Sequence, residues 1–298
     1  MLSLLFAPLV ERAGLFSCVQ DLSPQVERNV NLYVGITDHK GNAPIDIRPD
    51  DLEVYEDGIR QKITSASSET GPLSIGILID SSSSQKKHFS AVLRAVQSFI
   101  KSSAEESEFF LVTFGSEIKT ISDFADRRTT LSRLTNLAPE KRSKLYEAIH
   151  YGIAKVQQGT FARRALLLIT DGQDRGSSNS YRELFREIKR SDVQIYCLGV
   201  GNTNSDGGEG PGNYQIGHLL LEELAELTGG TVYTKDRPEQ LIAEAKLIAS
   251  QMWHQYRIVY QRTTSSGKEH WQKVKVRINA TRLHLKTKVR AREGFYTN

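Results

Sequence analysis

Ser74-Ile-Gly-Ile-Leu-Ile-Asp-Ser-Ser-Ser-Ser84 is the stretch of the chain that decides its fold. It begins with a short apolar run bounded by turn residues, which is typical of a fully buried central strand. Such a strand would carry Asp80, Ser82 and Ser84 (the strand-end cluster) to its carboxyl end, where ligands and metals bind in an open α/β sheet. One carboxylate and two hydroxyls are hard oxygen ligands, so they suit a small divalent cation such as Mg²⁺ better than zinc or copper.

The composition is that of an ordinary globular protein. The chain has 298 residues, of which 39% are hydrophobic and 25% charged, which is enough for one large domain or for two. Only Cys18 and Cys197 occur, which excludes a disulfide framework; Cys197 lies in an apolar run, where we expect a buried, inert thiol. No apolar segment reaches the roughly 20 residues that a membrane helix needs, so we expect no transmembrane segment.

The amino-terminal residues 1–27 are expected to be a leader or a disordered tail. Leu2 to Val10 could be the core of a signal peptide, but no basic residue precedes them and Glu11-Arg12 interrupts the apolar run. We therefore favour a truncated leader or a frayed tail and leave a signal peptide as the alternative. We expect an exported protein (periplasmic, in the cell envelope or secreted), with the cytoplasm as the alternative.

Strands and helices alternate over residues 71–253, and this pattern predicts a doubly wound, mainly parallel sheet with helices on both faces. A turn at Gly115-Ser116 predicts that an antiparallel edge strand, 118–124, follows the second strand. The other expected strands are 75–79, 108–114, 165–169, 193–200 and 231–234. The expected helices are 86–103, 144–158, 181–189, 219–227 and 238–253.

The two flanks of this region contain strand-like runs, with a hairpin turn expected at Asp57-Gly58. Residues 28–70 and 254–298 each hold too few strands to bury a core, so we expect them to form one small β-sandwich domain around the inserted domain 71–253. Charge supports this pairing, because residues 38–57 hold seven acidic and two basic residues whereas residues 255–298 hold two acidic and eleven basic ones. Opposite charges that face each other across strands stabilise a sheet.

Two further segments offer oxygen ligands for a cation at the strand-end cluster, and Mg²⁺ needs an octahedral set of them. Asp171 follows the apolar run Ala165-Leu-Leu-Leu-Ile169 in Thr170-Asp-Gly172, so its place at the end of a strand is equivalent to that of Asp80. Ser143 lies in Arg142-Ser-Lys-Leu-Tyr-Glu-Ala-Ile149, at the start of an expected helix. The sequence therefore predicts a cation site built from three loops.

At these residues the chain resembles the von Willebrand factor A domain with its metal-ion-dependent adhesion site. The family's motif is Asp-x-Ser-x-Ser, then a loop Thr, then Asp in Thr-Asp-Gly; this chain matches it at the strand-end cluster and at Asp171. Ser143 stands where the family has Thr, and the resemblance covers roughly residues 72–250. A narrower resemblance, to acidobacterial VWFA-related domain proteins, rests on Tyr33-Val-Gly-Ile-Thr-Asp-His-Lys-Gly41, Leu52-Glu-Val-Tyr-Glu-Asp-Gly58 and Val289-Arg-Ala-Arg-Glu-Gly-Phe-Tyr296.

The resemblance implies a metal-dependent protein-binding module for adhesion or interaction, with Mg²⁺ as the cation and Mn²⁺ or Ca²⁺ as alternatives. It implies that Ser82, Ser84 and Ser143 bind the cation directly, and that Asp80 and Asp171 act at least partly through water. One coordination position would stay open for an Asp or Glu carboxylate of a partner protein. Serine in place of threonine at position 143 keeps the hydroxyl and loses the methyl group.

Each element also has a simpler interpretation. Asp80 and its serines could cap a helix that begins near Lys86, and Asp171-Gly172 could be an ordinary turn. Enzyme motifs such as Gly-x-Ser-x-Gly, His-Glu-x-x-His and a Walker loop are absent from the sequence, so we expect no enzyme, no nucleic acid partner and no small-molecule substrate. A metal-independent scaffold, or a polyanion-binding protein, is the alternative function. A polyanion would bind the basic residues of the carboxyl-terminal strands: Lys273, Lys275, Arg277, Lys286, Lys288, Arg290 and Arg292.

Overall fold

The computed structural model describes residues 28–42, 47–135, 137–140, 142–201, 211–235, 238–262, 269–279 and 287–297. The expected leader, 1–27, lies outside the described residues. Among the described residues, no helix is both long enough and apolar enough to cross a membrane.

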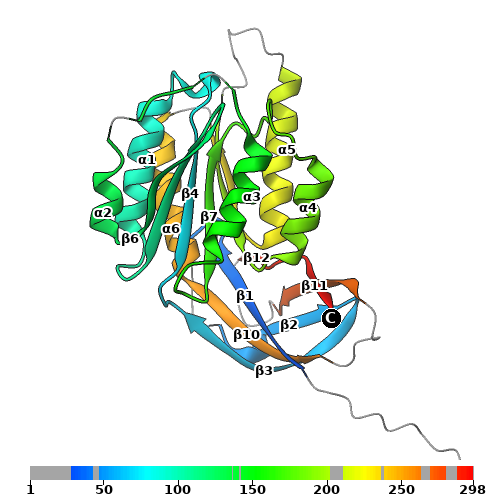
Figure 1. The fold of residues 1–298 in the computed structure, drawn as a ribbon. Helices are drawn as coiled ribbons and strands as arrows, with labels where there is room; N and C mark the ends of the chain where they lie inside the picture. Colours follow the sequence, from blue (N-terminus) through cyan, green and yellow to red (C-terminus); the bar gives the residue numbers. More distant parts are fainter. Residues whose placement is uncertain are drawn as a thin grey trace, which may run out of the picture.

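A six-stranded sheet occupies the middle of the chain, in the order β6-β5-β4-β7-β8-β9 (Figure 1). Its strands are β4 (Ser74–Asp80), β5 (Glu108–Phe114), β6 (Ile118–Ala125), β7 (Arg164–Thr170), β8 (Gln194–Val200) and β9 (Val232–Lys235). All neighbours pair in parallel except β5 and β6, which form the predicted antiparallel edge hairpin. All seven residues of β4 are buried, as the apolar run predicts for a central strand.

Helices cover both faces of this sheet, as predicted. They are α1 (Phe89–Ser102), α2 (Arg127–Ser132), α3 (Leu145–Val156), α4 (Tyr181–Arg190), α5 (Pro211–Thr228) and α6 (Pro238–Trp253). Apolar side chains of α1 and α6 pack on one face with Ile75, Ile77 and Ile79, while those of α3, α4 and α5 pack on the other face with Leu78. The two cores follow from the alternation of side chains along a strand. Helix α5 begins earlier than the sequence predicts, since Pro211 has the fixed φ that suits a first helical position.

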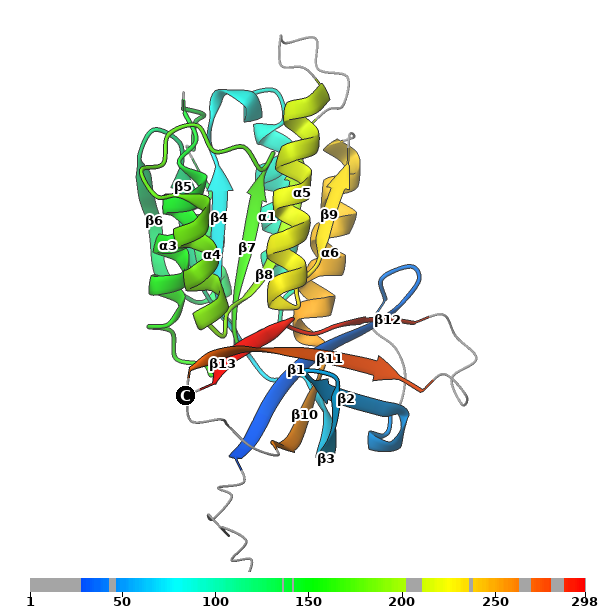
Figure 2. The same ribbon diagram turned by 90° about the vertical axis from the view of Figure 1, so that its right-hand side faces the viewer.

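The flanking strands form one curled antiparallel sheet of seven strands, in the order β12-β1-β10-β3-β2-β11-β13 (Figure 2). Its strands are β1 (Arg28–Asp38), β2 (Leu52–Glu56), β3 (Ile59–Glu69), β10 (Gln255–Arg262), β11 (His270–Ile278), β12 (Thr287–Arg290) and β13 (Gly294–Thr297), with a short 3₁₀ turn at Pro49–Asp51. The predicted pairing of the two flanks is confirmed, because β1 and β3 both pair with β10 and β2 pairs with β11. The structure refines the predicted sandwich to a single sheet, which curls enough for β11 to contact β12 and so encloses a core of its own.

Opposite charges meet inside this sheet, as the charge pattern predicts. Glu53 lies opposite Arg277 in the register of β2 and β11. Glu56 is 1% exposed, forms an ion pair with Arg262 at 3.4 Å and accepts a hydrogen bond from Tyr260. Asp57 and Gly58 have φ values of 46° and 84°, as a two-residue hairpin turn between β2 and β3 requires.

The basic outer face of the carboxyl-terminal strands is smaller than the sequence predicts. Lys273, Lys275 and Arg277 alternate on the exposed side of β11. Arg290 instead donates to the hydroxyl of Thr37, and Arg292 turns inward onto backbone carbonyls. Residue 286 lies outside the described residues.

The curled sheet packs against the end of the α/β sheet at which the parallel strands begin. Figure 2 shows the arrowheads of β4 and β7 pointing away from it. Gln255 at the start of β10 donates to the hydroxyl of Tyr196 in β8, and Trp253 donates to the carbonyl of Thr70. The carboxyl ends of the parallel strands therefore stay clear of the curled sheet and are open to other contacts.

Candidate metal site

The strand-end cluster and Asp171 lie at a topological switch point of the sheet. Strands β4 and β7 are parallel neighbours, so their carboxyl ends meet at one edge. After β4 the chain continues into α1 on one face, and after β7 it continues into α4 on the other. Open α/β sheets bind ligands at such a point, where the chain leaves neighbouring strands toward opposite faces.

Asp80 is the centre of the site and is 1% exposed. One carboxylate oxygen accepts the backbone N–H of Ser82 at 2.8 Å. The other accepts the hydroxyl of Thr170 at 2.6 Å and the hydroxyl of Ser143 at 3.3 Å. A hydroxyl that donates its proton to Asp80 keeps its oxygen lone pairs for another partner. Asp80 therefore orients hydroxyl oxygens from two other segments of the chain.

Ser82 and Ser84 lie next to each other, with their hydroxyl oxygens 3.0 Å apart. Ser82 is buried and Ser84 is exposed, so the cluster reaches from the interior to the surface. A 3₁₀ turn at Ser83–Gln85 follows, and its first residues receive no side-chain cap. Helix α1 also begins without a side-chain cap, at His88. The helix-cap interpretation of Asp80 and its serines is therefore wrong, because the carboxylate accepts hydrogen bonds from Ser82, Thr170 and Ser143 instead.

Ser143 reaches Asp80 because the loop before α3 is tied to the loop after β7. The carbonyl of Ser143 accepts the N–H of Arg175 at 2.9 Å, and the N–H of Tyr146 donates to Asp174 at 3.2 Å. The hydroxyl of Ser177 also donates to Asp174, at 2.6 Å. Asp174 thus joins these two loops.

Asp171 is held at the end of β7 by a tight turn. Its carboxylate accepts the N–H of Gln173 at 3.0 Å. Gly172 has φ of +81°, and a Cβ atom there would collide with the backbone of Gly217 in α5, so glycine is required at this position. Burial and then the negative charge of Asp171 raise the pKa of Asp80 to about 6, although hydrogen bonds from Ser82 and Thr170 lower it.

All five residues that the sequence predicts as cation ligands thus lie near one another at the carboxyl ends of β4 and β7. They supply two carboxylates and three hydroxyls, a set of hard oxygen atoms that fits Mg²⁺, Mn²⁺ or Ca²⁺. The two acidic side chains are close enough to repel each other, so a cation between them would be stabilised. The described part of the chain holds no group of three or more His, Cys, Asp or Glu side chains placed to bind a metal, so a site here depends on the serine hydroxyls.

Thr170 is the site residue that sequence reasoning missed. It is 0% exposed, and its hydroxyl donates to Asp80 and accepts the N–H of Gly172 at 3.1 Å. Its position directly before Asp171 in the Thr-Asp-Gly motif was the available signal. Thr170 ends β7 and Asp171 begins the turn, so which of them contacts Asp80 directly needed the structure.

A cavity of about 490 Å³, lined by both apolar and polar side chains, adjoins the site, and Gly172 and Gln173 form part of its wall. Among the described residues, the large apolar side chains classed as exposed are Ile59, Tyr181, Ile216 and Leu219. The last three line this cavity. Exposed apolar side chains that gather in this way mark an interaction surface.

Comparison with known families identifies the central part of the chain. Residues 74–217 match the family model described as the von Willebrand factor type A domain. The chain therefore contains a von Willebrand factor type A (VWA) domain, as the sequence motifs predict. A search of curated proteins gave no match.

Solved structures share this fold at low sequence identity. A von Willebrand factor type A protein from Catenulispora acidiphila aligns with a TM-score of 0.51 and 12% identity, over 90% of this chain and 74% of that chain. Proximal thread matrix protein 1 from the mussel byssus aligns with a TM-score of 0.52 and 14% identity, over 66% of this chain and 50% of that chain. At these identities the likeness shows the fold alone. The narrower acidobacterial resemblance stays a prediction.

Proposed function

We propose that this protein is a metal-dependent protein-binding module in which a divalent cation captures a carboxylate of a partner protein. The cation would be held by Asp80, Ser82, Ser84, Ser143 and Asp171, with Mg²⁺ as the first choice and Mn²⁺ or Ca²⁺ as alternatives. The observation that carries the proposal is the arrangement around Asp80, whose buried carboxylate accepts hydroxyls from two other segments beside the carboxylate of Asp171.

The kinds of ligand explain why such a cation would attract an anion. Ser82, Ser84 and Ser143 are neutral, so direct contacts with them leave the charge of the cation uncompensated. If Asp80 and Asp171 act through water, no carboxylate of this chain touches the cation. An octahedral cation with three serine ligands then keeps positions for water and for one carboxylate of a partner.

A protein is the partner that the surroundings favour. The cavity that exposes Tyr181, Ile216 and Leu219 shares the loop after β7 with the cation site. A partner whose Asp or Glu reaches the cation could therefore place an apolar side chain in the cavity. The proposed role is binding, for adhesion or another interaction, without enzymatic activity. Export of the protein stays a prediction from the sequence.

The cation site can be tested by calorimetry and thermal unfolding with Mg²⁺ or with EDTA. Wild-type protein should bind one cation and unfold at a higher temperature with Mg²⁺, and Asp80→Ala should lose both effects. Ser143→Ala and Ser143→Thr form a matched pair, because only the threonine variant keeps the hydroxyl. We expect the alanine variant to bind Mg²⁺ at least tenfold more weakly and the threonine variant to bind it at least as well as wild type.

Carboxylate capture can be tested with Mn²⁺ as the probe and acetate as the anion. Bound Mn²⁺ relaxes the protons of its coordinated waters, and acetate should reduce this effect by displacing a water. Wild-type protein that is indifferent to both Mg²⁺ and Mn²⁺ would favour the metal-independent scaffold. Cation binding without any response to acetate would refute the capture step alone.

A further inference from the structure

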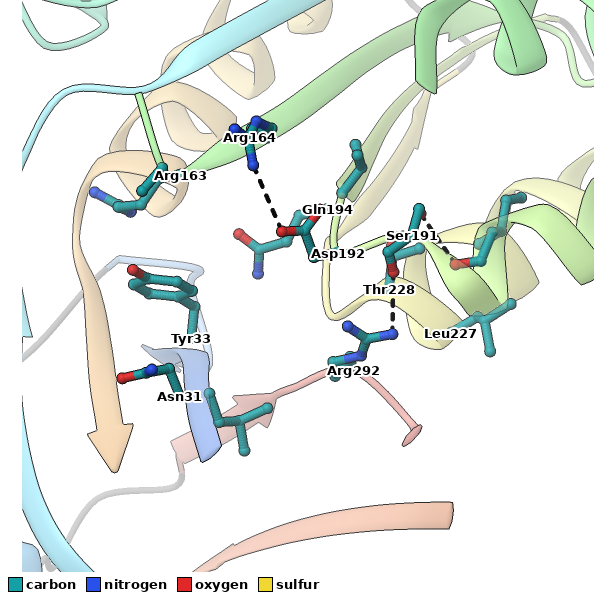
Figure 3. Close-up of a pocket in the computed structure, with 14 residues that line it drawn as sticks. Asn31, Tyr33, Arg163, Arg164, Ser191, Asp192, Gln194, Leu227, Thr228 and Arg292 are labelled. Atoms are coloured by element: carbon teal, nitrogen blue, oxygen red, sulfur yellow. Dashed lines mark hydrogen bonds and ion pairs between the residues drawn. The ribbon is translucent and has the colours of Figure 1, made fainter. Parts of the chain in front are cut away.

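A polar cavity of about 170 Å³ lies where the curled sheet meets the α/β sheet (Figure 3). Its walls come from β1, the start of β7, the segment before β8, the end of α5 and the turn before β13. Because β7 begins here and ends at Thr170, the cavity lies at the opposite end of the sheet from the candidate metal site. It is thus a separate feature of the molecule.

Positive charge exceeds negative charge on the wall of this cavity. The charged side chains that line it are Arg163, Arg164, Arg292 and Asp192. Asp192 forms an ion pair with Arg164 at 3.7 Å, which leaves the other two arginines without a carboxylate at ion-pair distance among the described residues. Arg163 points away from the centre and donates to the carbonyls of Gly71 and Met252. The unbalanced charge that faces the cavity is therefore that of Arg292.

Arg292 is held in place by backbone carbonyls, and the charge of Asp192 acts on it without forming an ion pair. Its guanidinium donates to the carbonyl of Gly294 at 2.6 Å, to that of Ser191 at 3.0 Å and to that of Lys189 at 3.4 Å. Burial lowers the pKa of Arg292, which shows that its charge is poorly solvated at this position. A guanidinium presents five N–H donors in a planar fork, so three carbonyls bound through Nε and Nη2 leave the Nη1 group for another acceptor.

Gln194 supplies a second hydrogen-bond donor, on the side of the cavity opposite Arg292. The side-chain oxygen of Gln194 accepts a hydrogen bond from Gln255 at 2.9 Å. Its amide N–H₂ group is therefore left to donate, and Figure 3 shows the Gln194 amide and the Arg292 guanidinium on opposite sides of the same space. Arg164 lies at the rim, where its Nε has no hydrogen-bond partner among the described residues.

We propose that this cavity binds a small tetrahedral oxyanion, phosphate or sulfate, between Arg292 and Gln194, with Arg164 at the rim. Arginine is suited to such anions because its donors match their oxygen atoms in pairs. The volume suffices, since a cavity of about 150 Å³ can hold a molecule as large as benzene. The side chain of Asp192 is 62% exposed, so the cavity has a route to solvent.

The proposed anion would connect the two sheets of the molecule. Arg292 belongs to the segment before β13 of the curled sheet, whereas Gln194 begins β8 of the α/β sheet. A ligand that contacts both would be bound by the folded protein and lost on unfolding. It would therefore raise the unfolding temperature, and the rise would grow with the ratio of its concentration to its dissociation constant.

The test measures the unfolding temperature and the binding isotherm of the full chain with EDTA present. Sodium phosphate and sodium sulfate are compared with sodium chloride at equal ionic strength. We expect wild-type protein to bind one phosphate or sulfate and to unfold at a higher temperature than in chloride. Equal unfolding temperatures in all three salts, with no binding isotherm, would overturn the proposal.

Two variants are expected to change the affinity for phosphate in opposite directions. Arg292→Gln should weaken phosphate binding at least tenfold, whereas Asp192→Asn removes the one negative charge of the wall and should tighten it severalfold. A destabilised fold cannot produce tighter binding, so Asp192→Asn remains informative if Arg292→Gln folds poorly. Arg128→Gln, an exposed residue of α2, is the matched control and should bind like wild type. Unchanged affinity in Asp192→Asn would refute the proposed site.

Discussion

Thr170→Val is the change that tests most directly how the site is held together. It removes one hydroxyl from a side chain that is 0% exposed and keeps the branched shape that suits a strand. The hydroxyl donates to Asp80 at 2.6 Å and accepts the N–H of Gly172 at 3.1 Å. The variant therefore breaks two hydrogen bonds and removes no proposed cation ligand.

The size of the effect follows from these two bonds. A hydrogen bond to a charged group contributes about 1.5–3 kcal/mol, and a buried donor left without an acceptor costs about 1–3 kcal/mol. Because both bonds share one hydroxyl, the two effects overlap, and we expect the free energy of unfolding to fall by about 2–4 kcal/mol. If the variant destabilises the cation-bound state by about 1.4 kcal/mol more than the cation-free folded state, its affinity for Mg²⁺ drops tenfold.

Urea unfolding with EDTA and calorimetric titration with Mg²⁺ separate the two effects. Thr170→Ser keeps the hydroxyl and loses only a methyl group, so it should retain Mg²⁺ affinity while losing some stability. A Thr170→Val protein that binds Mg²⁺ within twofold of wild type would refute the idea that this hydroxyl positions Asp80. A free energy of unfolding equal to that of wild type would refute the structural role as well.

Three further predictions concern the rest of the molecule. Glu56→Ala should lower the free energy of unfolding by about 3–5 kcal/mol in urea, because it leaves the buried side of Arg262 without its ion-pair partner; no loss of stability would contradict this account. Gly76→Val should cost about 1–3 kcal/mol or more, since any Cβ there meets the ring of Phe110, and thermal unfolding would show it; unchanged stability would mean that the core rearranges freely. Cys197 should resist alkylation in the folded protein, followed by peptide mapping, because it is buried and burial raises the pKa of its thiol; rapid labelling under native conditions would disprove this.

The α/β sheet could be predicted closely because its strands are buried on both faces. Apolar runs such as Ile75–Ile79 and Ala165–Ile169 can be identified as buried strands without knowing which strands they pair with, since any fold must bury them. The curled sheet was harder to predict from the sequence. Its strands alternate polar and apolar residues, so the sequence indicates that the two flanks pair but leaves the number of layers open.

The sequence by itself determined where the oxygen atoms of the candidate site would lie. Asp80 and Asp171 each follow an apolar run, and the carboxyl ends of parallel strands meet at one edge of a sheet. Ser143 stood out as a hydroxyl at the start of an expected helix and in the place of the family's loop threonine, and its contact with Asp80 required the structure.

Only the tertiary structure decided how these groups act on one another. The hydrogen bond from Thr170 to Asp80, the cavity beside Gly172 and the cavity around Arg292 all join segments that are far apart in the chain. Local patterns report what each segment must bury, because that depends on its own side chains. Which donor meets which acceptor depends on packing between segments, and no local pattern contains that information.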